Sequence, residues 1–329
     1  MKTTRNKFKP GEEFTMWRLQ KETTHMSLLE LRHVSKSFGS YKALDNVSFN
    51  VEPGRIVGLI GPNGAGKSTA MRAMTGLMRF DSGEVIFDEQ PVKFSKTKAL
   101  SKMGNLIEYP SIYPNFTAED HMKYYAMDSK DPEDIHELMK LTGIDGPNFG
   151  KRKAKHFSLG MKQRLGIAIA LVRKPKLVIL DEPMNGLDPQ SVREIRSLIQ
   201  HLAEKGIAFV ISSHLLDELQ RLADDVVIIN KGKIIRRATM AEFLSEDKAQ
   251  VKVKTSDNHA MVLAAEAAGW QVKMSEDGEV LITAENGVNA QAVLAKATEA
   301  NVEVQDIQTG TVNLEDHLME VLSENSTRA

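Results

Sequence analysis

The feature that most constrains the fold of this sequence is a glycine-rich stretch between a short apolar run and a helix-like segment. It consists of Gly61, Pro62, Asn63, Gly64, Ala65, Gly66, Lys67, Ser68 and Thr69. This order satisfies the pattern G-x-x-x-x-G-K-[ST], in which glycines let successive backbone N–H groups turn toward one anion. We expect a strand over residues 55–60, an anion-binding loop and a helix from about Lys67, which favour a P-loop NTPase fold.

The loop predicts that all nine residues contact a nucleoside triphosphate. The helix that follows directs the partial positive charge of its N-terminus at the phosphates. We expect Lys67 to reach the β- and γ-phosphates and the Ser68 hydroxyl to ligate Mg²⁺. Kinases, GTPases and motor proteins carry the same loop, so other motifs must decide the class.

A second strand-like run ends in two adjacent acids. Residues 177–180 are all apolar, and Asp181 and Glu182 follow them directly. A buried strand of a parallel sheet delivers such residues to the crevice at its carboxyl end. We expect Asp181 to hold Mg²⁺ and Glu182 to act as the general base that polarises the attacking water. The alternative, a core strand with a solvated acidic turn, is disfavoured after a phosphate loop.

The motifs that follow one another along the chain resemble those of ABC transporter ATPases over about residues 28–245. Residues 156–164 read His-Phe-Ser-Leu-Gly-Met-Lys-Gln-Arg, against the common family signature Leu-Ser-Gly-Gly-Gln. Ser158 and Gly160 match this signature, and the residues at 157, 159 and 161 depart from it. The resemblance implies that Ser158 and Gly160 form a second anion site, which closes on the γ-phosphate of ATP bound to another protomer.

The same resemblance implies three further site residues. Residues 186–189 read Gly-Leu-Asp-Pro and resemble the loop that crosses the dimer interface, which makes Asp188 an ATP-site residue. His214 follows a strand expected over residues 208–211, and would contact the γ-phosphate and hold Glu182 and water in line. Phe38 falls where the family places an aromatic ring on adenine, with Tyr41 as the alternative.

One position departs from the family pattern in a way that bears on the metal. The family usually carries a glutamine after a strand between the phosphate loop and the signature, where it touches the metal or its water. Here the strand-like residues 105–107 are followed by Glu108. Its carboxylate is a possible Mg²⁺ ligand, although it adds negative charge beside the phosphates. Together with residues 158–164, residues 108–114 resemble the branch that includes bacitracin and lantibiotic resistance exporters.

The chain divides by pattern into three zones. Residues 1–26 are polar and predict a flexible extension, and residues 27–245 alternate strands and helices as an α/β domain with a helical subdomain at about 110–172. Within that subdomain, Thr117 and Asp131 are expected helix caps. Residues 246–329 are acidic, and their pattern predicts strands and helices in the order βαββαβ, followed by a helix over 314–322. That order favours a small ferredoxin-like α+β module.

Composition excludes several classes of protein. The 329 residues carry a formal net charge of −1, which gives no support to a bulk electrostatic grip on nucleic acid or anionic lipid. There is no cysteine, so disulfides and thiolate zinc sites are excluded. No stretch approaches the roughly 20 apolar residues that span a bilayer, and no signal peptide is evident. We therefore expect a cytoplasmic protein, peripheral at the inner face of the membrane through a partner.

We interpret the sequence as an ATP-hydrolysing subunit of an ABC transporter that uses ATP and Mg²⁺. One phosphate loop and one signature per chain require a homodimer or a heterodimer, together with an integral membrane permease. The branch implies an antimicrobial peptide or a drug as the exported substrate. The alternatives are a non-transport ABC ATPase that acts on a macromolecular partner, and a module that senses ATP without turnover. The intact Lys67, Asp181, Glu182 and His214 argue against the sensor.

Overall fold

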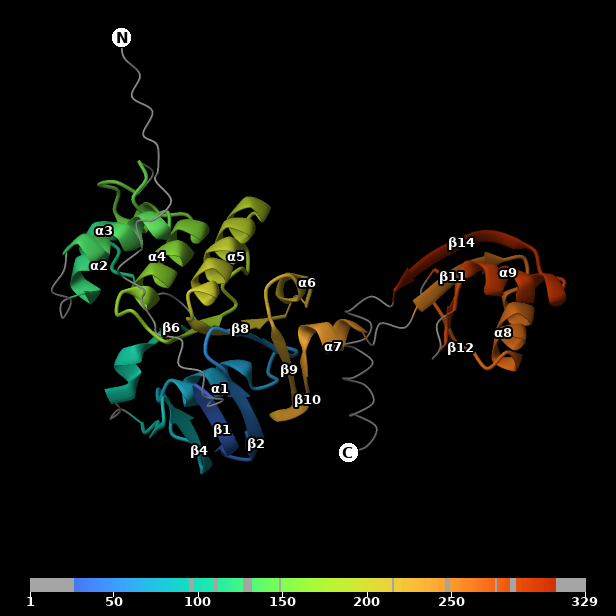
Figure 1. Ribbon diagram of the computed structural model, residues 1–329, viewed down its shortest axis with the longest axis horizontal. Coiled ribbons are helices and arrows are strands. Elements are labelled where there is room, and N and C mark those ends of the chain that lie inside the picture. The colour runs from blue at the N-terminus through green and yellow to red at the C-terminus, as the bar shows by residue number, and fades with distance from the viewer. Residues whose placement is uncertain are drawn as a thin grey trace, which may run out of the picture. The chain divides into compact units, whose positions relative to one another are not determined.

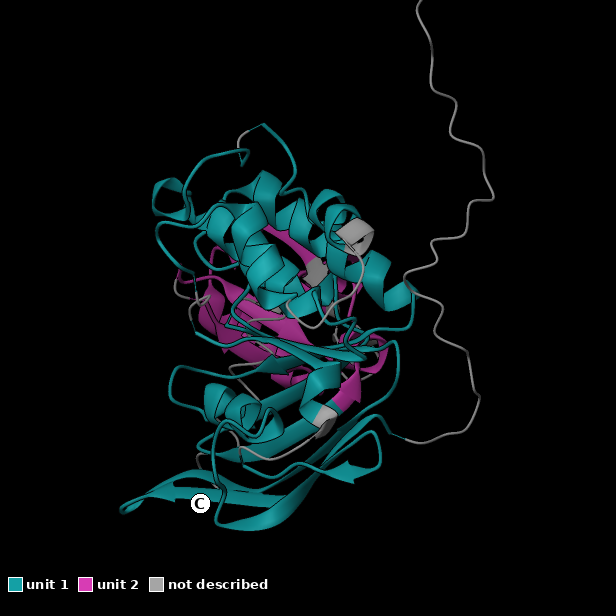
Figure 2. Ribbon diagram, turned by 90° about the vertical axis from the view of Figure 1, so that its left-hand side faces the viewer, with its two compact units in different colours: residues 1–237 teal, residues 238–329 magenta. Residues whose placement is uncertain are grey.

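The computed structural model describes residues 27–94, 98–108, 112–126, 132–147, 149–214, 216–245, 249–275, 277–284 and 288–311. The expectations for residues 1–26, 109–111 and 314–322 and for the cap at Asp131 lie outside these ranges. The chain forms two compact units, Met1–Arg237 and Ala238–Ala329, which Figure 2 colours separately.

A four-stranded antiparallel sheet begins the first unit. Its strands, in spatial order, are β2 (Tyr41–Val51), β1 (Leu29–Phe38), β4 (Ser82–Phe87) and β5 (Gln90–Pro91). Strands β1 and β2 form a hairpin that pairs Phe38 with Tyr41 at its tip, and Gly39 makes the turn with a φ of 59°. The two aromatic side chains that the sequence singles out for adenine therefore come from the same hairpin end.

The second sheet of this unit carries the motif-bearing strands. Its order is β10 (Lys233–Thr239), β9 (Asp225–Asn230), β3 (Ile56–Ile60), β8 (Ala208–Ser213), β7 (Leu177–Asp181) and β6 (Met103–Leu106). The neighbours from β9 to β6 pair in parallel. Every residue of β3, β7 and β8 is buried, as expected for continuous apolar runs covered on both faces. Because the strands are parallel, the segments after β3, β6, β7 and β8 meet at one edge.

Helices cover this sheet and extend from it. They are α1 (Lys67–Met74), α2 (Ala118–Tyr125), α3 (Pro132–Leu141), α4 (Leu159–Leu171), α5 (Pro189–Glu204) and α6 (Leu216–Gln220), with 3₁₀ turns at Lys98–Lys102 and Ala154–His156. In Figure 1, α2, α3 and α4 gather on the opposite side of this unit from β1, β2 and β4. Thr117 caps α2 in a capping box with Asp120, which confirms the expected start of that helix. The bounds of the helical subdomain stay a prediction.

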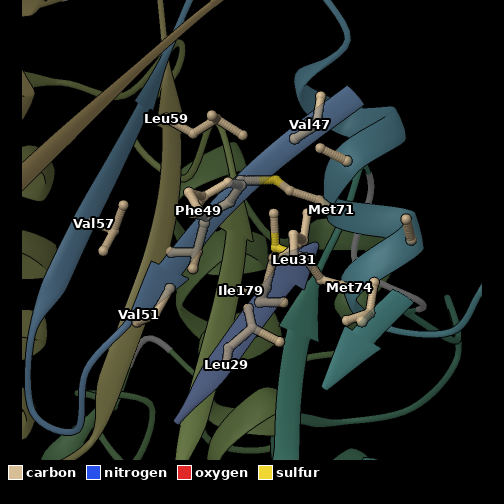
Figure 3. Close-up of a cluster of buried hydrophobic side chains, with 14 of the residues drawn as sticks. Leu29, Leu31, Val47, Phe49, Val51, Val57, Leu59, Met71, Met74 and Ile179 are labelled. Carbon is tan, nitrogen blue, oxygen red and sulfur yellow. The ribbon is translucent and has the colours of Figure 1, made fainter. Parts of the chain in front are cut away.

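A shared hydrophobic core fixes helix α1 between the two sheets. Met71 and Met74 of α1 are fully buried and belong to one cluster with Leu31 and Phe49 of the antiparallel sheet and Ile179 of the parallel sheet (Figure 3). Full burial of a methionine contributes about 1.5–3 kcal/mol to stability. The position of the helix N-terminus, where the phosphate loop ends, is thus set by packing on both sides.

The second unit is a smaller α+β module. After α7 (Met240–Ser245) come β11 (Ala249–Thr255), α8 (Asn258–Ala267), β12 (Gln271–Met274), β13 (Val280–Thr283), α9 (Ala290–Glu299) and β14 (Val304–Thr311). The sheet order is β12-β13-β11-β14 and its pairings are antiparallel. Val251, Ile282, Met261 and Val293 form its core with their neighbours. The ferredoxin-like classification of this module stays a prediction. Across the described residues, no helix combines the length and apolarity that crossing a bilayer requires.

Candidate active site

The loop between β3 and α1 needs glycine at two positions for reasons of space. A Cβ atom at Gly61 would lie 2.1 Å from the carbonyl oxygen of Ile229, and one at Gly66 would lie 2.6 Å from that of Ala43. Gly66 also has a φ of 110° and precedes α1 as its N-cap without a side-chain hydrogen bond to the helix. The first N–H groups of α1 therefore have no capping side chain, which suits an anion at the helix N-terminus.

Lys67 is a buried cation that lies over this loop. Its side chain is 7% exposed, and its Nζ donates to the carbonyl oxygens of Gly61 at 2.6 Å and Pro62 at 3.3 Å. Burial lowers the pKa of Lys67, and the opposing effect of Glu182 and Asp181 is smaller. The Glu182 carboxylate lies 4.0 Å from Nζ. Phosphate oxygens are stronger acceptors for an ammonium group than carbonyl oxygens are, so a bound phosphate can replace the carbonyl groups of Gly61 and Pro62.

The oxygen atoms of Ser68 and Asp181 suit a magnesium ion. The Ser68 hydroxyl donates to Oδ2 of Asp181 at 2.7 Å, so the expected metal ligands of α1 and β7 already meet. Within the described residues, no group of three or more His, Asp or Glu side chains gathers as a metal site. Mg²⁺ commonly takes one or two protein oxygens and completes its shell with phosphates and water, so this small donor set fits the ion.

Glu182 and His214 are joined by a hydrogen bond. Nδ1 of His214 lies 2.8 Å from Oε2 of Glu182, and since an ionised carboxylate only accepts, the imidazole donates. Glu182 has a φ of 48°, in the left-handed region, and its backbone N–H donates to the Ser212 hydroxyl at 2.9 Å. The proposed base is therefore oriented through both its carboxylate and its backbone.

Two residues near Glu182 and His214 were not predicted from the sequence to belong to the site. Ser212 precedes His214 by two residues, and its hydroxyl also donates to Oδ1 of Asp181. Glu218 on α6 lies four residues after His214 in the sequence, and burial, with a smaller effect of the Glu182 charge, raises the pKa of Glu218. In the sequence, Ser212 stands out only as a polar residue at the end of an apolar strand. Its contact with Asp181 depends on the pairing register of β7 and β8.

Glu108 lies after β6 at the same edge of the sheet, but its carboxylate pairs with Arg72 of α1. Glu108 has a φ of 68°, again in the left-handed region. Ser68 and Asp181, the other two expected metal ligands, bond to each other. The structure thus brings two of the three expected ligands together and gives the third a cationic partner, and a direct role of Glu108 at the metal stays a prediction.

The two aromatic candidates for adenine have different neighbours. Phe38 is 52% exposed, and Nζ of Lys36 lies 5.3 Å from its ring centroid. Tyr41 is 55% exposed, and its hydroxyl donates to the carbonyl oxygen of Gly64 in the phosphate loop at 2.8 Å. The alternative residue, Tyr41, therefore contacts the phosphate loop, whereas the ring of Phe38 lies under the Lys36 ammonium. Which ring stacks on adenine stays a prediction.

Ser158, Gly160 and Asp188 meet elsewhere, at a pocket of about 440 Å³ between the N-termini of α4 and α5. Ser158 caps α4 by accepting the Met161 N–H at 3.3 Å. Asp188 caps α5, accepts the Ser191 hydroxyl at 2.7 Å, and these hydrogen bonds lower its pKa. Among the described residues, no hydrogen bond or ion pair joins these three to Lys67, Asp181 or Glu182. The expected site residues thus fall into two separate groups within one chain.

The two departures from the common signature that flank Ser158 point in different directions. Phe157 is buried, with its ring centroid 5.2 Å from that of Phe149. Leu159 is half exposed on the first turn of α4. Phe157 thus anchors the loop in the helical region, while Leu159 remains on the surface beside the pocket.

Comparison with known proteins places these observations in a family. The family model for ABC transporters matches residues 44–185. The chain is 45% identical over 209 residues to the lantibiotic transport ATP-binding protein SrtF of Streptococcus pyogenes, which covers 63% of this chain and 89% of that protein. It is 35% identical over 305 residues to the bacitracin transport ATP-binding protein BcrA of Bacillus licheniformis, which covers 90% of this chain and 97% of that protein.

Solved structures show the same fold. An ATP-binding subunit of an ABC transporter is 28% identical with a TM-score of 0.61, covering 67% of this chain and 92% of that one. A nucleotide-free ATP-binding cassette is 26% identical with a TM-score of 0.59, covering 65% and 92%. These matches confirm the expected α/β P-loop fold.

Proposed function

This chain belongs to the ATP-binding subunits of ABC transporters, and we propose that two copies close head to tail around two ATP molecules to drive a separate membrane permease. ATP hydrolysis coupled to transport is the shared activity of the chain and its relatives. The observation that carries the proposal is the cluster at the carboxyl edge of the parallel sheet, where Glu182 lies between Lys67 and His214.

Each residue of this cluster has a role in hydrolysis. The loop from Gly61 to Thr69 and the N-terminus of α1 hold the phosphates, and Lys67 pairs with the β- and γ-phosphates. Ser68 and Asp181 would hold Mg²⁺, which neutralises phosphate charge when bound. Glu182 accepts a proton from the water that attacks the γ-phosphorus, while His214 holds the Glu182 carboxylate in place.

The pocket around Ser158 serves the ATP of the second copy. A two-fold axis places the pocket of one copy opposite the phosphate loop of the other, so each ATP is held from both sides. Asp188 lies on the same pocket and would contact the facing copy. Because each γ-phosphate then links the two copies, its loss on hydrolysis lets the pair reopen, and the permease follows this motion.

The relatives favour a peptide antibiotic as the transported substrate. SrtF and BcrA are named for transport of lantibiotics and of bacitracin. We extend this substrate class, antimicrobial peptides, to this chain, which then acts at the inner face of the membrane by binding its permease.

The test is the substitution Glu182→Gln. The amide keeps the size of the side chain but accepts no proton, so we expect ATP binding without turnover and a trapped dimer in Mg²⁺-ATP by size-exclusion chromatography. The matched control is Glu204→Gln, at the far end of α5, which should hydrolyse ATP at the parental rate. Parental hydrolysis by Glu182→Gln would show that Glu182 is not the base.

A further inference from the structure

Ser212 occupies a central place in the parallel sheet. It lies on β8, between β3, which leads into the phosphate loop, and β7, which ends at Asp181. Its Cα partners in these strands are Leu59 and Asp181. The side chain is 0% exposed, so every polar atom of Ser212 must find its partner inside the protein.

The Ser212 hydroxyl bridges the two adjacent acids. It donates its single hydrogen to Oδ1 of Asp181 and accepts the backbone N–H of Glu182 at 2.9 Å. The other carboxylate oxygen of Asp181, Oδ2, accepts from Ser68. The two oxygens of Asp181 therefore have separate partners, one on the strand side and one on the side of the phosphate loop.

The bridge also fixes a backbone conformation that favours glycine. Glu182 has a φ of 48°, which a residue with a Cβ adopts only where its surroundings hold it there. The hydrogen bond from its N–H to Ser212 is a restraint of this kind. If the hydroxyl were absent, the backbone N–H of Glu182 and Oδ1 of the buried Asp181 would both lose a partner.

We propose that Ser212 is a positioning residue that holds the metal-binding carboxylate and the catalytic base as one unit. By occupying Oδ1 it leaves Oδ2 of Asp181 directed toward Ser68, where the ion would bind. By holding the N–H of Glu182 it fixes the direction in which that side chain leaves the strand. This inference rests on the proposed function of Asp181 and Glu182.

The experiment compares Ser212→Ala and Ser212→Thr with the parental chain. Binding of Mn²⁺ in the presence of a non-hydrolysable ATP analogue is followed by electron paramagnetic resonance, and binding of the analogue alone is measured in EDTA. Loss of a group that orients a metal ligand typically weakens metal binding about 10- to 100-fold. We expect this loss in Ser212→Ala, with unchanged analogue binding in EDTA, and Mn²⁺ affinity close to parental in Ser212→Thr, which keeps a hydroxyl.

Two further variants keep the result interpretable. Thr142→Val removes another buried hydroxyl, which donates to Leu138 in α3 at 2.7 Å, and should leave Mn²⁺ binding unchanged. Ser212→Cys keeps a side chain of similar size that is only a weak hydrogen-bond donor, and it should also lose Mn²⁺ affinity. This variant tests the role of the hydroxyl if Ser212→Ala does not fold.

The outcomes separate this inference from the proposed function. Parental Mn²⁺ affinity in both Ser212→Ala and Ser212→Cys, or an equal loss in Thr142→Val, overturns the role of Ser212. A parental chain that binds the analogue but gains no Mn²⁺ site overturns the proposed metal site itself.

Discussion

Arg72 on helix α1 and Glu108 after strand β6 form an ion pair next to the proposed metal site. Arg72 follows Ser68 by four residues, so the two side chains lie on the same face of α1, one turn apart. The acid that replaces the usual family glutamine is therefore balanced by a cation. The side chains of Arg72 and Glu108 are 37% and 56% exposed, and such pairs stabilise a fold by at most about 1 kcal/mol. The main consequence of the Arg72–Glu108 pair is therefore its effect on the charge near the phosphates.

The first prediction concerns that charge balance. Arg72→Gln leaves the Glu108 charge uncompensated, so we expect the KM for ATP to rise about three- to fivefold at low salt and less at high salt. Arg72→Gln combined with Glu108→Gln removes both charges and should restore the parental KM. Steady-state hydrolysis at two salt concentrations measures this.

The control for this pair is Arg32→Gln, which breaks an ion pair with Glu30 on strand β1 and should leave the KM unchanged. If the double variant is as impaired as Arg72→Gln, the guanidinium acts by something other than compensating Glu108.

Much of this site follows from the sequence because its motifs are local. Fewer than ten consecutive residues are enough to recognise each of three motifs: the phosphate loop, the strand before Asp181 and the strand before His214. The strands were predicted because parallel strands buried on both faces are continuously apolar. The contact from Ser212 to Asp181 spans 31 residues, and that from Arg72 to Glu108 spans 36. Such pairs depend on strand register and helix placement, which no local pattern encodes.

The second prediction concerns Lys67 and pH. Burial lowers the pKa of Lys67 below its ordinary value, and phosphate binding favours its charged form. ATP affinity should therefore fall as the pH rises through this lowered pKa, because the free protein then loses the ammonium. In the absence of ATP, raising the pH has the opposite effect on the stability of the fold. The unfolded chain holds the proton more tightly, so the free energy of unfolding rises with pH between the folded and unfolded pKa values.

Substitution checks the same residue. Lys67→Ala removes a charge-assisted contact with the phosphates, and we expect ATP affinity to fall about 10- to 100-fold. Its alkaline pH dependence should disappear as well. Lys176→Ala, which removes a lysine paired with Asp88, should keep both the affinity and its pH profile. Calorimetric titration with ATP over a pH series measures both effects, and an unchanged affinity in Lys67→Ala would contradict the role of the loop.

The last prediction tests whether two copies share each ATP site. Lys67→Ala damages the phosphate-loop half, and Ser158→Arg fills the pocket that would face the other copy. Each variant alone should hydrolyse almost no ATP. In an equal mixture, half of the dimers contain one copy of each, and one of their two sites is built from intact halves, so roughly a quarter of the parental rate should return. Mixing Lys67→Ala with Glu182→Gln should restore nothing, because both changes lie in the same half and no intact site forms. Equal recovery in the two mixtures, or none in the first, would mean that Ser158 does not complete the site of a second copy.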